Sequence, residues 1–344
     1  MPIVEIPHAA NPARAPGVGA EPDGSDLSIV MVLKLKQPNG PMADSAPVAD
    51  TPAIVRWVID DIRARGNEAV RCYSNKFDYW SPASFKLLPD EIQQIISTVP
   101  RQIINDIKQI QENARVFTLA QKVSLKDFEL EIRPGVHLGQ KSIPISSVGA
   151  YIPGGRYLLL ASSHMTILTA KCAGVPHVTA CTPPIAGKIP VNTIAAMHLA
   201  GADEIYILGG VQAIAAMAVG TETMKKVDFI AGPGNAFVAE AKRQLFGEEI
   251  GIDLPAGPTE ILIVADEHAD PFTVATDLLS QAEHGFDSPA VLITTSQTVG
   301  EKTIQEVNRL LKILPTADVA GISWNRLGEV VVVDNLDEAY HVSQ

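Results

Sequence analysis

The sequence predicts an α/β protein with two doubly wound parallel-sheet domains. From residue 147 onward, short apolar segments of strand length alternate with helical stretches, which is typical of βαβ units. These segments form two sets, and Gly or Pro follows each strand of the first set. The alternation, the grouping and the turn residues together indicate two domains with a cleft between them.

The strands and helices of the two sets follow in order along the chain. In the first set the expected strands are Val148–Ile152, Val178–Thr182, Glu204–Leu208 and Asp228–Ala231. The helices expected between and after them are Ser162–Ala173, Pro190–Ala200, Gln212–Val219 and Asn235–Phe246. In the second set strands and helices alternate as Glu260–Ala265, Pro271–Glu283, Ala290–Thr295, Gly300–Leu314 and Glu329–Val333.

The residues before these sets are of two kinds. Residues 1–46 are dominated by Pro, Ala, Gly and acidic residues with one apolar patch at 27–35, so we expect a disordered or extended segment. It contains a single arginine, whereas a mitochondrial presequence is rich in arginine and poor in acidic residues. From Thr51, an expected N-cap, one helical stripe runs to Gly66 and a second covers about 90–120. We interpret both stripes as core packing.

The composition narrows the class of function. Hydrophobic residues make up 46% of the 344 residues, and the net charge of −12 argues against binding nucleic acid or an anionic membrane surface. No run of 18 apolar residues is present that could span a bilayer. The three cysteines neither form a disulfide framework nor have zinc-site spacing, so we expect a reduced, cytoplasmic protein.

Turns rich in glycine and proline follow the strands of the first set. They are Pro153-Gly154-Gly155, Pro183-Pro184, Gly209-Gly210 and Gly232-Pro233-Gly234. In a parallel sheet such turns share one edge, where glycine allows close backbone approach and helix N-termini offer N–H groups to anions. Tight turns need glycine in any case, and the GxGxxG fingerprint is absent. The pattern fits a phosphate-containing cofactor without naming one.

Gln281 and His284 lie on one face near the expected end of a helix, with Gly285 as its expected C-cap. Imidazole is a common zinc ligand and a Gln amide oxygen an uncommon one, so a metal site is one interpretation. The alternative is structural, because a His near a helix C-terminus interacts favourably with the helix dipole. Two protein ligands do not hold zinc alone.

Five motifs, in order, resemble the histidinol dehydrogenase family. They are Gly149-Ala-Tyr-Ile-Pro-Gly-Gly155, Gly209-Gly-Val-Gln-Ala-Ile-Ala-Ala216, Gly232-Pro-Gly-Asn-Ala-Phe237, Ala256-Gly-Pro-Thr-Glu260 and Leu279-Ser-Gln-Ala-Glu-His-Gly285. The resemblance implies two Rossmann-like domains, one (148–257) inserted in the other (47–147 plus 258–344). It also implies an intertwined homodimer that oxidises a small primary alcohol through an aldehyde to a carboxylate while reducing two NAD.

Cofactor and metal residues carry over from the resemblance position by position. Tyr151, Gln212 and Asn235 match positions that contact NAD. Structural alternatives are a strand-end core residue for Tyr151 and a helix cap for Asn235. Gln281 and His284 match two of the four zinc ligands, which also meet the substrate.

Two further positions concern the substrate. Thr259 stands where family members usually have a Ser that touches substrate, and it keeps the hydroxyl. Arg156 and Tyr157, followed by His164, replace the small uncharged residues of the histidinol branch. This segment looks more like sulfopropanediol 3-dehydrogenases, which oxidise 2,3-dihydroxypropane-1-sulfonate, and an Arg offers several N–H donors to an anionic group. A surface Arg paired with a carboxylate is the alternative.

The family's catalytic Glu-His pair and its remaining Asp and His zinc ligands have no counterpart before the last residue, Gln344. Residues 334–340 resemble the helix that leads to that pair. For a complete protein the resemblance implies zinc that orients the alcohol, a base that removes its proton, and hydride transfer to NAD. The alternative is a truncated, catalytically inactive paralogue that acts as a nucleotide-binding or interaction protein.

Overall fold

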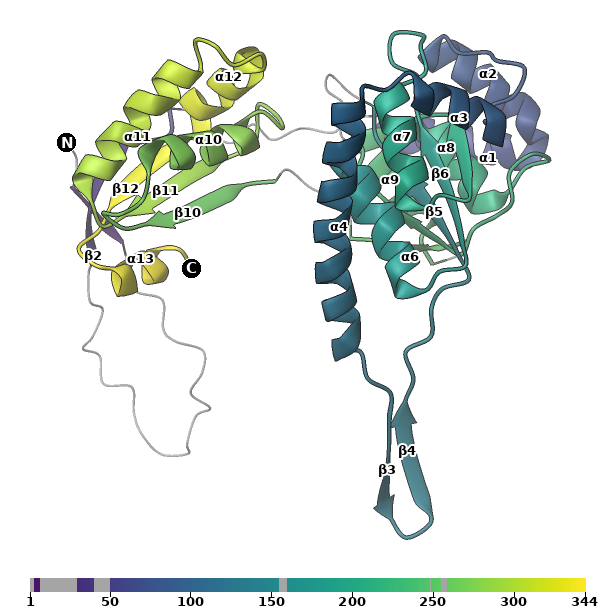
Figure 1. Cartoon of the computed structure of the whole chain (residues 1–344), viewed down its shortest axis with the longest axis horizontal. Helices are drawn as coiled ribbons and strands as arrows, with labels where there is room; N and C mark the ends of the chain where they lie inside the picture. The colour runs from purple at the N-terminus through teal and green to yellow at the C-terminus, as the bar shows by residue number, and fades with distance from the viewer. Residues whose placement is uncertain (1–2, 7–29, 40–49, 155–159, 248, 255–258) are drawn as a thin grey trace. The chain divides into compact units, whose positions relative to one another are not determined.

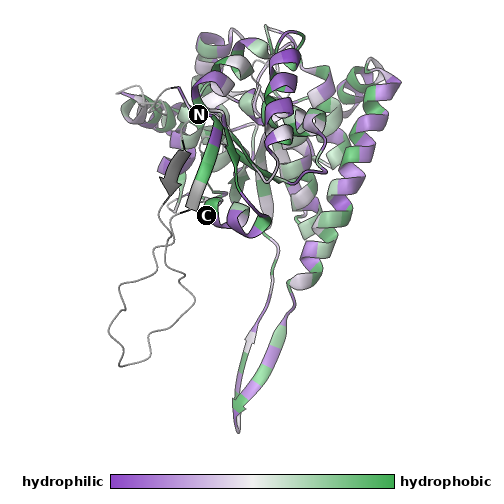
Figure 2. Ribbon diagram, turned by 90° about the vertical axis from the view of Figure 1, so that its left-hand side faces the viewer, coloured by the Kyte–Doolittle hydropathy of each residue, from purple (hydrophilic) through white to green (hydrophobic). Residues whose placement is uncertain are grey.

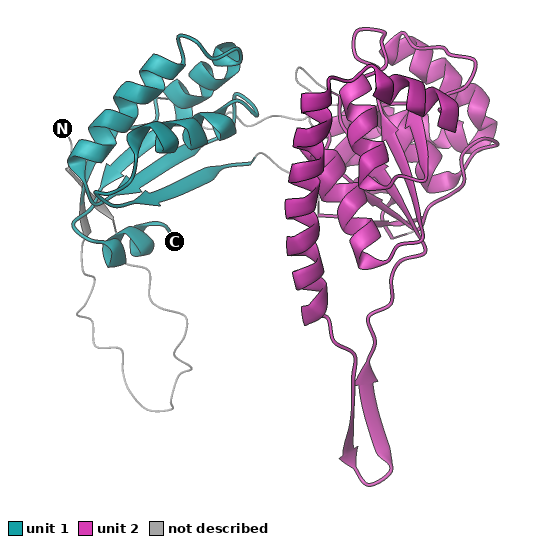
Figure 3. Cartoon of the chain, viewed as in Figure 1, with its two compact units in different colours: residues 1–46, 257–344 teal, residues 47–256 magenta. Residues whose placement is uncertain are grey.

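The computed structural model divides the chain into two compact units (Figure 3). Unit 1 comprises residues 1–46 and 257–344, and unit 2 comprises residues 47–256. The residues that the structure describes are 3–6, 30–39, 50–154, 160–247, 249–254 and 259–344. Unit 2 is therefore inserted, in sequence, between the two parts of unit 1.

A parallel sheet forms the centre of unit 2 (Figure 1). Its strands are β5 (Ser147–Tyr151), β6 (His177–Thr182), β7 (Glu204–Ile207), β8 (Phe229–Ala231) and β9 (Gly251–Ile252). They lie in the order β7-β6-β5-β8-β9, and each neighbouring pair is parallel. The strand order reverses between β5 and β8. Such a reversal is the switch point at which open α/β sheets bind ligands.

Helices cover both faces of this sheet. They are α5 (Leu160–Ser163), the π-helix His164–Leu168, α6 (Thr169–Ala173), α7 (Val191–Ala200), α8 (Gly210–Val219) and α9 (Ala236–Leu245). On one face α8 and α9 share a core with Tyr151 and Ile230, and on the other the π-helix, α6 and α7 pack around Val178 and Ile205. The prediction of a parallel α/β sheet is confirmed for this unit.

The helices upstream of β5 also belong to unit 2. They are α1 (Thr51–Arg65), α2 (Asn67–Asp78), α3 (Pro89–Ser97) and α4 (Arg101–Ser124). Side chains of α1 and α2, such as Ile62 and Tyr73, enter the core that contains α8 and α9, whereas α3 packs on α7. We expected residues 47–147 to form one domain with 258–344. In the structure they belong to unit 2 instead. An apolar stripe predicts a buried helix face but does not identify the partner that buries it.

Two further features of unit 2 depart from the expected elements. The helical zone expected over 90–120 is divided at Pro100, which lies between α3 and α4 and has no N–H to continue a helix. Beyond α4 the strands β3 (Phe128–Arg133) and β4 (Val136–Gln140) form an antiparallel hairpin that projects from the unit (Figure 1). Every residue of both strands is exposed.

Unit 1 contains a mixed sheet. Its strands are β1 (Ile3–Ile6), β2 (Val30–Lys36), β10 (Ile261–Ala265), β11 (Ala290–Thr294) and β12 (Glu329–Val332). In the order β1-β2-β12-β11-β10 the last three are parallel, whereas β2 is antiparallel to both β12 and β1. The expectation of a fully parallel sheet is wrong here, because it came from the βα alternation of residues 260–333 alone.

The segment 1–46, expected to be disordered or extended, supplies β1 and β2 to this sheet. Val32 is fully buried in a cluster with Ile293 and Val331. The disordered alternative is therefore wrong for 30–36, because the apolar patch there finds its partner in β12. Residues 7–29 and 40–49 lie outside the described part of the chain.

Helices lie on both faces of the unit 1 sheet. They are α10 (Pro271–Ala282), α11 (Gln297–Leu310), α12 (Ala317–Leu327) and α13 (Leu336–Val342). The first three share a core with Leu292 and Val330, and α13 packs on the other face through Ala339. None of the helices in the described residues of either unit is both long and apolar enough to cross a membrane.

Candidate functional site

The turns after β5, β6 and β7 meet at the carboxyl edge of the unit 2 sheet. A Cβ at Gly154 would lie 2.5 Å from Pro183 Cγ, and one at Gly209 would lie 2.4 Å from Pro183 Cβ. Side chains at either glycine would collide with the proline, so the backbones of the first and third turns pack directly on the Pro183 ring. The expectation that these turns gather at one edge is confirmed. We call this edge, with Tyr151, Gln212 and Asn235, the switch-point edge.

The turn after β8 is held by an ion pair between Lys242, which is buried, and Asp253, which is partly exposed. Gly232 has φ +131°, and a Cβ there would lie 2.1 Å from Tyr151 O, so only glycine fits beside β5. Asp253 Oδ2 accepts a hydrogen bond from Gly232 N at 2.8 Å, and Lys242 Nζ donates to Gly232 O at 2.9 Å. Lys242 is 3% exposed and also pairs with Asp253. Both polar groups of the Gly232 backbone are therefore held by side chains of unit 2.

Tyr151, the last residue of β5, links that strand to the start of α8. Its side chain is buried, and its hydroxyl oxygen accepts a hydrogen bond from Gly210 N at 3.0 Å. Burial raises the pKa of the Tyr151 phenol above its ordinary value, so the group is neutral. The contact satisfies one of the N–H groups that a helix N-terminus leaves without an intrahelical partner. The interpretation of Tyr151 as a strand-end core residue therefore agrees with its burial.

Gln212 lies in the first turn of α8 and is 1% exposed. Its Nε2 donates a hydrogen bond to Asp78 Oδ2 at 2.9 Å. Asp78, the last residue of α2, is half-buried. Burial raises the pKa of Asp78, and the Gln212 hydrogen bond opposes that change. Sequence reasoning missed Asp78, because the segment that carries it is far along the chain from the glycine turns. One signal could have found it: a carboxylate at a helix C-terminus, where the helix dipole disfavours negative charge.

Asn235 is the N-cap of α9, directly after the Gly232–Gly234 turn. Its Oδ1 accepts hydrogen bonds from Phe237 N and Val238 N, both at 3.1 Å. The side chain is exposed at the switch-point edge. The cap interpretation is thus correct, and a capped helix N-terminus beside a strand end is also a position where anions bind.

The positions expected to distinguish substrates are only partly within the described residues. Arg156 and Tyr157 lie outside them. His164 is 2% exposed and begins the π-helix. Gln111 Nε2 donates to Ala196 O at 2.9 Å and lies 3.1 Å from His164 Nδ1. A carbonyl only accepts, so the amide nitrogen faces both groups and Nδ1 is the acceptor. Burial lowers the pKa of His164, which leaves a neutral ring with its proton on Nε2.

In unit 1 the end of α10 meets the segment before β10. Gln281 Nε2 donates to Thr259 O at 2.9 Å and to Thr259 Oγ1 at 2.6 Å, which turns the amide oxygen away. His284 Nδ1 lies 2.9 Å from Ser280 O. Because that carbonyl only accepts, Nδ1 carries the proton and Nε2 keeps its lone pair, the arrangement of a metal-binding His. We call Thr259, Gln281 and His284 the α10 corner.

The α10 helix ends at Ala282, so the expected C-cap at Gly285 is wrong. Glu283 caps the helix in the right-handed conformation, and His284 N donates to Gln281 O at 3.0 Å in a turn. Glu283 Oε2 accepts a hydrogen bond from Thr316 Oγ1 at 2.7 Å and is thereby occupied. Gly285 is unnecessary as a cap because this turn already satisfies the last backbone groups.

The α10 corner fits part of a zinc site. Gln281 and His284 offer one oxygen and one nitrogen, whereas bound zinc normally has at least three protein ligands. Within the described residues no group of three or more His, Cys, Asp or Glu side chains is placed to hold a metal ion. The described residues therefore do not form a complete zinc site.

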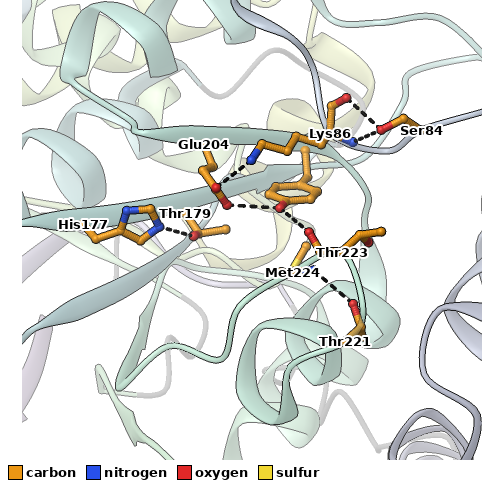
Figure 4. Close-up of polar contacts among 9 residues, drawn as sticks. Ser84, Lys86, His177, Thr179, Glu204, Thr221, Thr223 and Met224 are labelled. Atoms are coloured by element: carbon orange, nitrogen blue, oxygen red, sulfur yellow. Dashed lines mark hydrogen bonds and ion pairs between the residues drawn. The ribbon is translucent and has the colours of Figure 1, made fainter.

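A second polar cluster lies at the start of β7, at the opposite end of the strand from the switch-point edge (Figure 4). Lys86 Nζ pairs with Glu204 Oε1 at 2.6 Å, and the Tyr206 hydroxyl lies 3.1 Å from Glu204 Oε2. Burial alone would raise the pKa of Glu204, but the hydrogen bonds from Lys86 and Tyr206 outweigh it and lower that pKa. The cluster ties residues around Lys86 to the outer strand β7 and is structural.

A parallel sheet with helices on both faces and glycine turns at its switch point defines unit 2 as a Rossmann-like fold. The family model for histidinol dehydrogenase matches residues 43–344. The chain belongs to the histidinol dehydrogenase family, whose members are oxidoreductases.

Individual relatives agree with this membership. The chain is 60% identical over 285 residues to a histidinol dehydrogenase homolog of Shouchella clausii, covering 83% of this chain and 67% of the relative. It is 43% identical over 300 residues to the sulfopropanediol 3-dehydrogenase of Ruegeria pomeroyi, covering 86% and 68%. The crystal structure of histidinol dehydrogenase from Elizabethkingia anophelis matches with a TM-score of 0.80 and 36% identity, covering 86% and 67%. The chain thus spans about two thirds of the length of these relatives.

Proposed function

We propose that the chain is part of a zinc- and NAD-dependent alcohol dehydrogenase that oxidises a primary alcohol, via an aldehyde, to a carboxylate with two NAD. The switch-point edge is the observation that carries this proposal. Tyr151, Gln212 and Asn235 come from β5, α8 and the start of α9, and the fold brings all three to the edge where such sheets bind nucleotides. NAD, when bound, accepts the hydride.

The chain's own groups have distinct tasks in this proposal. Asn235 and the start of α9 face the cofactor phosphates, and the rigid Gly232 turn fixes the position of that helix start beside β5. Gln281 and His284 are two of the zinc ligands and, with Thr259, contact the substrate. The orientation of both side chains supports this role. Gln281 Nε2 and His284 Nδ1 are engaged in hydrogen bonds, which directs Gln281 Oε1 and His284 Nε2 toward a ligand. Because the described residues do not complete a zinc site, we derive no chemical step through the metal.

As substrate we propose an alcohol that bears an anionic group, of the 2,3-dihydroxypropane-1-sulfonate type, rather than histidinol. Arg156 supports this choice through its charge. Overall similarity does not separate the branches, because the relative at 60% identity is named only a homolog and the sulfopropanediol relative is 43% identical. A higher kcat/KM for histidinol than for the sulfonate, in an active enzyme that carries this chain's residues, would refute this choice.

We also propose a homodimer. The hairpin and the end of α4 expose large apolar side chains, and Figure 2 shows hydrophobic residues along the hairpin. They are Val116, Phe117, Val123, Phe128, Leu130, Ile132, Val136 and Leu138. Exposed apolar surface of this kind marks protein–protein contacts. Sedimentation equilibrium tests the proposal, and a monomer at micromolar concentration would contradict it.

Turnover separates this function from the second candidate, a nucleotide-binding or interaction protein without catalysis. The incomplete zinc site within the described residues favours that candidate for the chain as it stands. The test is NADH production by the folded, zinc-loaded chain with a panel of amino alcohols and sulfonated diols. Turnover supports the dehydrogenase, whereas NAD binding without turnover supports the second candidate for this chain.

A further inference from the structure

Asp78 is a carboxylate at the switch-point edge that the proposed function does not use. It ends α2 and reaches Gln212, whose amide nitrogen lies 2.9 Å from Asp78 Oδ2. Its charge is also close enough to the Tyr151 hydroxyl to add to the rise in the phenol's pKa that burial causes. Asp78, Gln212 and Tyr151 therefore form one polar cluster where α8 begins beside the end of β5.

The position of Asp78 is unfavourable for a negative charge. The side chain is half-buried, and burial raises its pKa. It also lies at the C-terminus of a helix, where the dipole repels anions. Among the described residues the Gln212 amide is the one group that lowers the pKa again. A neutral Asn could accept the same hydrogen bond from Gln212 without these costs, so holding Gln212 does not explain a carboxylate here.

This inference rests on the proposed function, in which NAD binds at the switch-point edge. We propose that the Asp78 carboxylate accepts a hydrogen bond from a ribose hydroxyl of the dinucleotide. A hydroxyl that donates to a carboxylate makes a charge-assisted bond, stronger than one to a neutral amide. The same charge repels a ribose that carries a phosphate. Asp78 thereby selects NAD over NADP, the task that an acidic residue performs in other dinucleotide sites.

The test is Asp78→Asn in the full chain, with NAD and NADP affinities measured by calorimetry. The Kd for NAD should rise about tenfold, because a hydrogen bond to a charged group is exchanged for one to a neutral group. The Kd for NADP should stay constant or fall, so the preference for NAD drops at least about tenfold. The melting temperature of the ligand-free variant should rise by about 2 °C, because an unfavourable charge has been removed. A purely structural Asp78 would instead leave the preference unchanged and lower the melting temperature.

Two further variants keep the result interpretable. Asp78→Glu retains the charge but displaces it, so NAD should bind more weakly while NADP remains excluded. Asp61→Asn is the matched control: Asp61 lies on α1, bonds to Tyr73 and Arg65, and should affect stability without changing the preference.

The failure of this inference is distinct from the failure of the proposed function. A wild-type chain that binds neither NAD nor NADP would refute both. A wild-type chain that binds NAD, together with an Asp78→Asn variant of unchanged preference, would refute only the role of Asp78.

Discussion

The switch-point edge of unit 2 and the α10 corner of unit 1 differ in how completely each is built. At the edge, Tyr151, Gln212 and Gly232 are buried and held by hydrogen bonds within their own unit. At the corner, Thr259 and His284 are exposed, and the described residues offer a metal two donor atoms. A ligand site at strand ends is complete once its sheet has folded. A metal site instead needs donors from several separate segments.

Metal content is the largest difference we expect between the two regions. After dialysis against a mild chelator, the 344-residue chain should retain far less than one zinc per chain, because two ligands placed in advance contribute little affinity. A longer chain that carries the further Asp and His ligands implied by the family resemblance should retain about one zinc. Elemental analysis provides the measurement. Stoichiometric zinc in the shorter chain would show that other residues complete the α10 corner.

The rigidity of the edge predicts a large effect for Gly232→Ala. The new Cβ would meet Tyr151 O at 2.1 Å and would force a strained φ, so the variant should lose about 3 kcal/mol of unfolding free energy. NAD affinity should fall with it. Gly187→Ala is the control, because φ is +70° there but a Cβ would meet no atom beyond its chain neighbours within 4 Å. This variant should lose only about 1 kcal/mol of unfolding free energy. Urea denaturation measures both variants. Equal losses of unfolding free energy in Gly232→Ala and Gly187→Ala would contradict the rigidity of the edge.

Asn235→Ala should affect both stability and cofactor binding. Loss of the cap should cost about 1 kcal/mol, and the Kd for NAD should rise about tenfold. Asn335, which caps α13 in unit 1 through Glu338 N, provides the matched control. Asn335→Ala should cost a similar free energy of unfolding and leave NAD affinity unchanged. Calorimetric titration measures the NAD affinity of both variants. Identical affinities would show that Asn235 does not contact NAD.

The smallest effect is a pH dependence in unit 1. Burial lowers the pKa of Lys36 to about 8, and Glu329 partly opposes this change. The folded pKa is lower than the unfolded value of 10.5, so the buried charge reduces stability below about pH 8. That loss should be relieved, by up to about 1 kcal/mol, as the pH rises from 8 toward 10.5. Urea denaturation across this range measures it. Lys36→Met should flatten the profile and leave NAD affinity intact, and an unchanged profile would contradict the assignment to Lys36.

The parts of the fold that were predictable from the sequence are those with local periodicity. The strand expected at Val178–Thr182 is β6, and the glycine turns do meet at one edge, because turn chemistry and βα alternation are encoded within a few residues. The pairing of β2 with β12 joins distant parts of the chain, so no local pattern indicates it. The hairpin and α12 were likewise absent from the expected elements.

The candidate site shows the same division. Tyr151, Gln212 and Asn235 could be named because they sit in glycine-rich motifs that resemble a known family. Asp78 could not, because its contact with Gln212 depends on how α2 packs against α8. The hydrogen bonds that orient Gln281 and His284 also needed coordinates, since spacing alone gives a shared helix face but not the direction of a donor atom.

Titration of NAD into the metal-stripped chain tests most directly whether the switch-point edge is a complete site without the α10 corner. Calorimetry should give one NAD per chain with a Kd that is the same, within about twofold, before and after zinc is added. Absence of binding heat, or binding that appears only with zinc, would contradict the account.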